Sequence, residues 1–207
     1  QGWILQEFIN GPVGTTTFVA NEGKLYLQYS VENRVCMRDG TGPSMLCEPV
    51  EDAQLDHIVA QMVENGGVNG LTGFDWMRRE DGSYVVIDPH FGRVVPNAVV
   101  GYRYGLAFDR AVILSLALEE PQPVTLGPDS TGSVWVFPQA LQLLFEPSKW
   151  HYLKQYNPLS KDIHCFFCGK GEWRLFLVQS VEFCWGRFRV LLGGLRARYF
   201  TQRTQGR

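Results

Sequence analysis

Two aspartates close short apolar runs on either side of a predicted turn. Asp75 follows Gly73-Phe74, and Asp88 follows the apolar residues 84–87. Between them, Asp81-Gly82 is a strong short-range hairpin signal. An antiparallel hairpin would bring both carboxylates to the same end, where they could bind a hard divalent cation such as Mg²⁺ through oxygen. A surface hairpin with acidic ends explains the same pattern, so the hairpin alone leaves both interpretations open.

The elements that must position these aspartates alternate between strands and helices. The clearest helix is predicted over residues 52–65, because Leu55, Ile58, Val59, Met62 and Val63 recur at helical spacing and Gly66-Gly67 follow. A second, largely apolar helix is predicted over residues 104–118 and is expected to be buried. Residues 39–43, with two glycines, are predicted to form a loop. Strands are predicted over residues 3–9, 15–20, 24–31, 71–77 and 83–88.

The composition sets limits on the class of protein. The chain has 207 residues, 45% of them hydrophobic, and a net charge of −2. These values indicate one domain, or a domain with an appendage, and no general attraction to nucleic acid. No uninterrupted apolar run approaches the length of a membrane span. Five scattered cysteines suit a reducing compartment, so we expect a cytoplasmic protein. The chain begins Gln1-Gly2-Trp3 and reads as the downstream part of something longer.

The character of the chain changes near residues 119–123, where we predict a boundary between residues 1–120 and residues 121–207. Residues 134–145 are predicted to form a strand and then a helix that begins near Pro138. Residues 172–207 hold seven arginines against two glutamates, interleaved with large apolar side chains. This predicts a mostly helical, basic C-terminal extension. Such a helix could lie on an anionic membrane surface or pack against an N-terminal portion of the protein, and packing is favoured.

The pair Cys165 and Cys168 is a weak signal for a metal or redox site. A structural zinc site needs four ligands, usually as two spaced pairs, and only Cys184 follows. The two phenylalanines between the cysteines favour partial burial instead, and no zinc site is predicted.

The order of the features resembles the C-terminal half of the ATP-grasp fold. Residues 6–9, Gln-Glu-Phe-Ile, precede a glycine and a hairpin. There then follow, in order, an arginine-containing segment, an amphipathic helix, Gly73-Phe74-Asp75, the Asp-Gly turn and the strand ending in Asp88-Pro89. The resemblance covers residues 3–118. It implies an α+β fold in which helices pack on an antiparallel sheet, and a carboxylate–amine or carboxylate–thiol ligase that uses ATP and Mg²⁺ to form an acyl phosphate.

The resemblance also implies which residues bind the nucleotide and the metal. Gln6, Glu7, Phe8 and Ile9 match the family's hinge strand. There the side chain of Gln6 would face the exocyclic amine of adenine, and the main chain of Glu7 and Ile9 would frame the ring. Asp75 matches the first metal-binding acid. Residues 87–92 match the segment Glu-Ile-Asn-Pro-Arg-Phe-Gly, which supplies the remaining metal ligands.

Two registers relate residues 86–92 to that segment. The first register is favoured by the matches at Pro89, Phe91 and Gly92. In it, Asp88 replaces the metal-binding Asn, Val86 replaces the Glu and His90 replaces the Arg. In the second, Asp88 replaces the Glu and His90 the Asn. Imidazole is a poor ligand for Mg²⁺, so His90 is predicted to contact a phosphate or to cap the turn.

Two arginines are further catalytic candidates. Arg34 lies where family members often place a basic residue that faces the phosphates or the acyl substrate, and Arg93 follows the metal strand. A positive group there would offset charge on the transferred phosphoryl group. A solvated arginine at a strand end is the plainer interpretation of Arg34.

Two functional hypotheses remain open at the level of the sequence. The first is an ATP- and Mg²⁺-dependent ligase, acting on a small carboxylate and an amine and completed by an N-terminal ATP-grasp half that has no counterpart in residues 1–207. The second is a non-catalytic ATP-grasp remnant, a nucleotide-binding or interaction module. The family's ribose-binding acid also has no equivalent in Gly11-Pro12-Val13-Gly14. The altered acid-Asn-Arg signature and the missing first half favour the second hypothesis for this molecule, whereas the shared architecture favours the first for its lineage.

Overall fold

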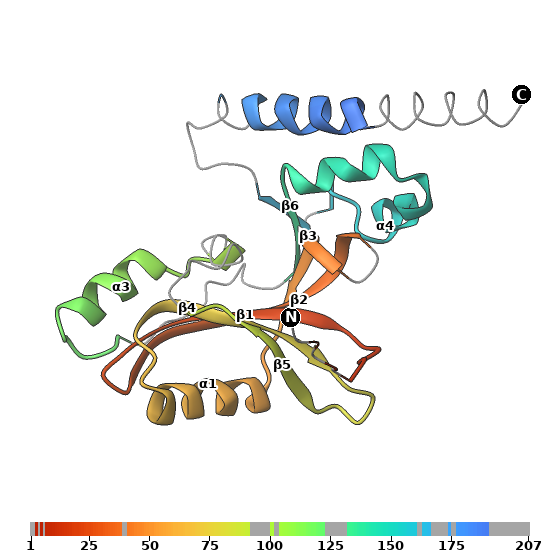
Figure 1. Ribbon diagram of the computed structural model, residues 1–207. Coiled ribbons are helices and arrows are strands. Elements are labelled where there is room, and N and C mark those ends of the chain that lie inside the picture. Colours follow the sequence, from red (N-terminus) through yellow and green to blue (C-terminus); the bar gives the residue numbers. More distant parts are fainter. Residues whose placement is uncertain are drawn as a thin grey trace, which may run out of the picture.

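A mixed sheet forms the centre of the computed structural model (Figure 1), which describes residues 3, 5, 7–38, 41–91, 100–101, 104–122, 132–160, 163–166, 174 and 177–190. Over this part of the chain the sheet has seven strands in the order β5-β4-β1-β2-β3-β6-β7. Neighbours are antiparallel except β6 and β7, which are parallel. The strands are β1 Val13–Asn21, β2 Lys24–Arg38, β3 Thr41–Pro49, β4 Gly70–Arg78, β5 Tyr84–Pro89, β6 Ser133–Val136 and β7 Ile163–Phe166.

Two helices cover opposite faces of this sheet (Figure 1). Helix α1 (Ala53–Gly66) buries Leu55, Val59 and Val63 against one face, together with Phe18, Ala20, Phe74 and Trp76. Helix α3 (Phe108–Leu116) packs on the other face, where Val19, Tyr29 and Val31 join Tyr104, Leu106 and Phe108. The predicted α+β class with helices packed on the sheet is confirmed, and the predicted antiparallel arrangement holds for β1 to β6, which β7 joins in parallel.

Helix α1 forms where the sequence predicts it, because both ends carry suitable caps. The side chain of Asp52 accepts a hydrogen bond from the backbone N–H of Gln54 at 2.9 Å. Gly67 adopts the left-handed conformation that commonly ends a helix, with φ of 57°. The predicted helix over residues 52–65 is therefore confirmed to within a residue at each end.

The prediction of a strand over residues 3–9 is wrong for the part of that range that is described. Residues 7–10 have no regular structure, and the ladder with β4 begins only at Val13. Pro12 accepts a hydrogen bond from the N–H of Arg78 at 2.9 Å but has no N–H to return. The missing donor explains why the ladder does not extend toward the N-terminus.

Two other boundaries differ from the prediction. Residues 41–43 belong to β3 instead of the predicted loop. The second helix is shorter than residues 104–118, and only one side of it is buried: Phe108, Ala111 and Ser115 face the sheet, whereas Ile113 and Leu116 are exposed. The largely apolar sequence of this helix predicted that it would be buried, but the sheet covers only one side of it.

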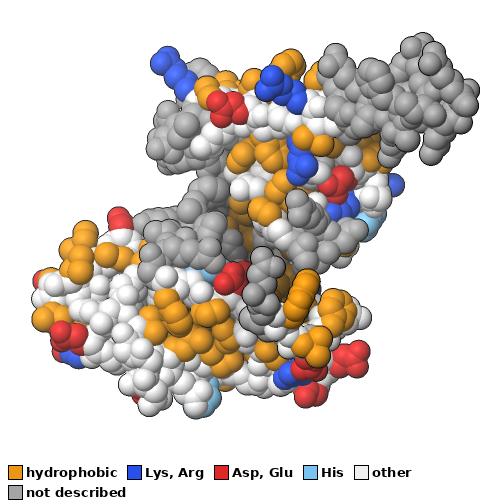
Figure 2. Space-filling view, viewed as in Figure 1, with side chains coloured by type: hydrophobic (Ala, Val, Ile, Leu, Met, Phe, Trp, Pro, Cys, Tyr) orange, Lys and Arg blue, Asp and Glu red, His pale blue; other side chains and the backbone are white. Residues whose placement is uncertain are grey.

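The C-terminal region adds strands as well as helices. Strand β6 and the 3₁₀ helix η1 (Gln139–Phe145) form where a strand and a helix are predicted, and β6 joins the sheet through β3. The short helices η2 (Pro147–Lys149) and α4 (Trp150–Gln155) follow. Residues 177–190 are helical and form the uppermost helix in Figure 1. They expose large apolar side chains, and hydrophobic and basic side chains lie together along the top of the space-filling view (Figure 2). Within the described residues, no helix combines the length and apolar character needed to cross a bilayer.

The cysteines show no sign of a metal site where they are described. Cys36, Cys47 and Cys184 are free thiols. The backbone of Cys165 lies in β7, and Cys168 lies outside the described residues. The boundary near residue 120 stays a prediction.

Candidate metal and nucleotide site

The β4–β5 hairpin places Asp75 and Asp88 directly opposite each other. The two residues are cross-strand partners, and the turn is closed by hydrogen bonds between Arg79 and Ser83 (2.8 Å) and between Gly82 and Arg79 (3.0 Å). The predicted Asp-Gly turn therefore joins the two strands, and a register shift between Asp75 and Trp76 makes Asp88 the partner of Asp75. On the other side of β4, Thr15 of β1 is the partner of Asp75.

Strand alternation decides which face carries the acids. Phe74 and Trp76 are fully buried among the residues that pack on α1. Successive side chains of a strand point to opposite faces, so Asp75 lies on the face away from α1. Thr15 lies on the same face and is 4% exposed, and its hydroxyl donates a 2.6 Å hydrogen bond to Asp75 Oδ1. This bond fixes the position of the carboxylate.

His90 completes the group because its backbone is bound to β4. Its N–H donates to the carbonyl of Gly73 at 2.7 Å, and its carbonyl accepts from the hydroxyl of Thr72 at 2.9 Å. The side chain is 9% exposed. Its Nε2 lies 3.3 Å from Asp75 Oδ1, and its Nδ1 lies 3.6 Å from Asp88 Oδ2. The imidazole thus lies between the two carboxylates.

The three side chains are close enough to share one metal ion. One donor atom from each of Asp75, Asp88 and His90 lies within 4.8 Å of the other two. Ligands about 2 Å from a common metal are roughly 3–4 Å apart, so modest rearrangement would suffice. The two carboxylates, 33% and 56% exposed, fit a hard ion such as Mg²⁺, whereas the imidazole does not.

The grouping favours the second of the two sequence registers. Val86 pairs with Trp76 and packs against the α1 side of the sheet. A register shift between Asp75 and Trp76 then turns Asp88 to the opposite face. Asp88 and His90, two residues apart, therefore converge on Asp75, while Val86 lies away from it.

The candidate Arg34 is engaged by two glutamates. Its Nη1 pairs with Glu32 and its Nε with Glu48, and Arg78 also approaches Glu32, with 3.5 Å between Nη2 and Oε2. Burial lowers the pKa of Arg34, but its hydrogen bond to Glu48 and the charges of both glutamates outweigh this and raise the pKa overall. The role predicted for Arg34 stays a prediction, as does that of Arg93, which lies outside the described residues.

The predicted adenine-binding residues are only partly described. Ile9 is buried, Phe8 is 88% exposed, and Gln6 lies outside the described residues. The carboxylate of Glu7 pairs with Arg79 at 2.8 Å, at the turn of the β4–β5 hairpin. The segment that carries the predicted nucleotide edge therefore reaches the same hairpin as the acids. Its role in binding adenine stays a prediction.

Two residues of the site have no specific signal in the sequence. Thr15 reads only as one of several β-branched strand residues, and Thr72 as part of a strand. Their hydroxyls bind Asp75 and the backbone of His90 respectively. Assigning Thr15 and Thr72 to the site from the sequence would have required the pairing register of β1 against β4.

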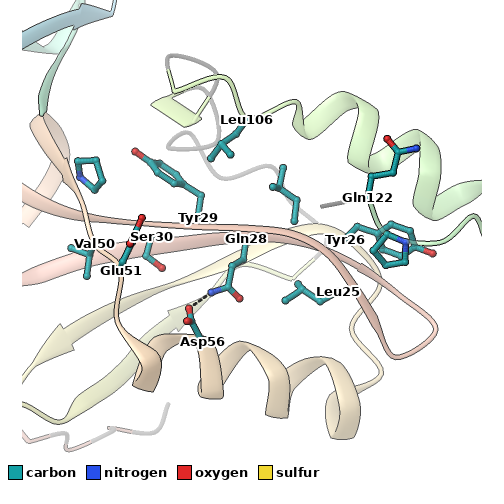
Figure 3. A pocket seen from close by; sticks show the side chains of 13 residues that line it. Leu25, Tyr26, Gln28, Tyr29, Ser30, Val50, Glu51, Asp56, Leu106 and Gln122 are labelled. Carbon is teal, nitrogen blue, oxygen red and sulfur yellow. Dashed lines mark hydrogen bonds between the residues drawn. The ribbon is translucent and has the colours of Figure 1, made fainter. Parts of the chain in front are cut away.

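A cavity of about 740 Å³ lies elsewhere, along β2 (Figure 3). Strand β3 pairs with β2 only from Val31 onward, which leaves residues 24–30 of β2 without a strand on that side. Gln28 and Asp56 line the cavity on the α1 side, and Tyr29 and Leu106 on the other side (Figure 3). Its lining includes neither Asp75 nor Asp88.

Comparisons with known proteins find structures with a related fold. No protein-family model matches the sequence, and no curated protein matches it. An L-amino acid ligase from Bacillus licheniformis aligns with 58% of this chain and 31% of its own, at 14% identity and a TM-score of 0.41. The biotin carboxylase of Campylobacter jejuni, solved as a β,γ-ATP complex, aligns with 62% of this chain and 30% of its own, at 11% identity and a TM-score of 0.43.

The ATP-grasp ligase PsnB, complexed with a minimal precursor, aligns with 55% of this chain and 36% of its own, at 15% identity and a TM-score of 0.34. The chain thus spans about a third of the length of these three structures. At these identities and TM-scores the likeness identifies neither a family nor an activity for this chain.

Proposed function

We propose that this chain is the metal- and nucleotide-binding part of an ATP-dependent ligase. The observation that carries the proposal is the cross-strand pair Asp75 and Asp88, held in register by the hairpin with His90 between them. The sequence resemblance supports it separately, because the predicted adenine-binding segment precedes these acids in the expected order.

The reaction would join a small carboxylate to an amine or a thiol. A carboxylate oxygen attacks the γ-phosphorus of ATP, and the bond to the β,γ-bridging oxygen breaks to release ADP. The nucleophile then attacks the carbonyl carbon of the acyl phosphate, loses its proton, and displaces inorganic phosphate. Asp75 and Asp88 would hold a divalent ion, Mg²⁺ by resemblance, which neutralises phosphate charge. Arg34 and Arg93 would stabilise the transferred phosphoryl group, and an N-terminal half would complete the cleft.

A nucleotide-binding module without catalysis is the second candidate. The observation that favours it is the pairing of Arg34 with Glu32 and Glu48, which occupies two of its nitrogens. This candidate predicts that ATP binds at the aspartates but that no carboxylate and amine pair promotes the release of ADP.

Calorimetry and thermal unfolding with ATP and either MgCl₂ or MnCl₂ test the proposal. Ligand at 100 times its Kd should stabilise the fold by about 2.7 kcal/mol. Asp75→Asn and Asp88→Asn should remove most of this stabilisation. Asp81→Asn is the matched control, because it makes the same change in the same hairpin and keeps the oxygen that accepts from Ser83. Equal losses in all three variants, or no stabilisation of the unaltered chain, would contradict the proposal.

A further inference from the structure

The acidic pair is accompanied by an imidazole whose position is fixed by the fold. His90 is 9% exposed, and both ring nitrogens face carboxylate oxygens, at 3.3 Å and 3.6 Å. The backbone of His90 is held on β4 by two hydrogen bonds, one to the carbonyl of Gly73 and one from the hydroxyl of Thr72, and neither uses the ring. An ion that reached both aspartates would therefore meet this ring.

The donor set of two carboxylate oxygens and one nitrogen does not suit Mg²⁺. Magnesium requires oxygen ligands in near-octahedral geometry, whereas imidazole suits zinc, iron, nickel and copper, and carboxylate suits manganese as well. Replacing an oxygen ligand by imidazole therefore shifts a site away from magnesium and toward first-row transition metals.

We propose that the site formed by Asp75, Asp88 and His90 binds a divalent first-row transition metal in preference to Mg²⁺, with His90 as a direct ligand. This deepens the proposed function because the same ion would hold the phosphates of ATP. The remaining coordination positions lie on the exposed side of the group, where Asp88 is 56% exposed and Asp75 is 33% exposed. Phosphate oxygens or water can reach an ion from that side.

One carboxylate of the group is already oriented by a hydrogen bond within the sheet. Thr15 already donates to Asp75 Oδ1, so this carboxylate is oriented without any ion. The expected donors are the carboxylate oxygens of Asp75 and Asp88 and a ring nitrogen of His90.

The test uses metal alone, followed by metal with ATP. Calorimetric titrations with Mn²⁺, Co²⁺ and Zn²⁺ should each give a Kd lower than that for Mg²⁺ by roughly tenfold or more, rising in affinity from manganese to cobalt. The visible spectrum of bound Co²⁺ should show nitrogen coordination. His90→Asn supplies an amide oxygen in place of nitrogen, and it should reduce the preference for Mn²⁺ over Mg²⁺ and change the cobalt spectrum.

His57→Asn is the matched control, because His57 lies exposed on α1. It should leave both readouts unchanged. Equal affinity for Mg²⁺ and Mn²⁺ in the unaltered chain, or a cobalt spectrum unaffected by His90→Asn, would overturn the inference. The two proposals can fail separately. Selective metal binding without any effect of ATP would refute the nucleotide role alone. ATP binding that needs Asp75 but shows no metal preference would refute the metal selectivity alone.

Discussion

Gly14 lies where no side chain can be accommodated, which makes Gly14→Ala a demanding test of the packing beneath the site. A Cβ added at Gly14 would lie 2.1 Å from Cζ2 of Trp76 and 2.3 Å from the carbonyl oxygen of Val31. Trp76 is fully buried, and the carbonyl belongs to the neighbouring strand β2. Neither group can move without disturbing the sheet.

The expected loss follows from these contacts. Overpacking a well-filled core costs about 1–3 kcal/mol, and the backbone contact places this case near 3 kcal/mol. For a chain of this size, that loss lowers Tm by roughly 6–12 °C. Gly186→Ala is the control, since a Cβ there meets nothing within 4 Å and the position is helical. It should be neutral or slightly stabilising.

A double-mutant cycle identifies the cause. Trp76→Phe removes the outer indole ring that the new methyl group would strike, so the double variant should lose less than the sum of the single losses, by about 1 kcal/mol. Chemical denaturation of the four proteins measures this directly. Additive losses, or a Gly14→Ala variant that melts within about 2 °C of the unaltered chain, would refute the packing of Trp76 over β1.

Three further outcomes follow from the structure. Asp52→Ala removes the N-cap of α1 and should cost about 1–2 kcal/mol in urea unfolding; no loss would mean that the cap is not formed. Thr15→Val removes the hydroxyl that orients Asp75 and should weaken metal binding about tenfold or more while Tm changes little; unchanged affinity in calorimetry would contradict this orienting role. Burial raises the pKa of Cys47 to about 12, so its thiol stays protonated at pH 8 and should resist alkylation that modifies the half-buried Cys184; peptide mapping that finds equal modification would show that the site of Cys47 is open.

Local sequence signals predicted the elements that form the site. The Asp-Gly turn and its flanking apolar runs predicted the hairpin, and helical spacing followed by Gly66-Gly67 predicted α1. These features depend on neighbours a few residues apart. The turn fixes the pairs from Arg78 opposite Tyr84 to Trp76 opposite Val86, because a short hairpin connection determines which residues face each other. That register alone would place Asp75 opposite Ile87, and the register shift beyond Trp76 makes Asp88 its partner.

Long-range pairings lay beyond such signals. The bond between Thr15 and Asp75 joins residues 60 positions apart. The register shift that turns Asp88 and His90 to one face, with Val86 on the other, depends on packing against α1. Strand β6 joins β3 across 87 positions, as the pairing of Cys47 with Val134 shows. None of these contacts leaves a periodic pattern in the sequence.

The central claim is that Asp75, Asp88 and His90 bind one divalent ion that holds a nucleotide. Anomalous diffraction at the manganese edge, from crystals grown with Mn²⁺ and a non-hydrolysable ATP analogue, tests it most directly. We predict an anomalous peak about 2.0–2.4 Å from one atom of each of the three side chains and beside the phosphates. A map without a peak there, or with manganese and analogue bound elsewhere, would contradict the account.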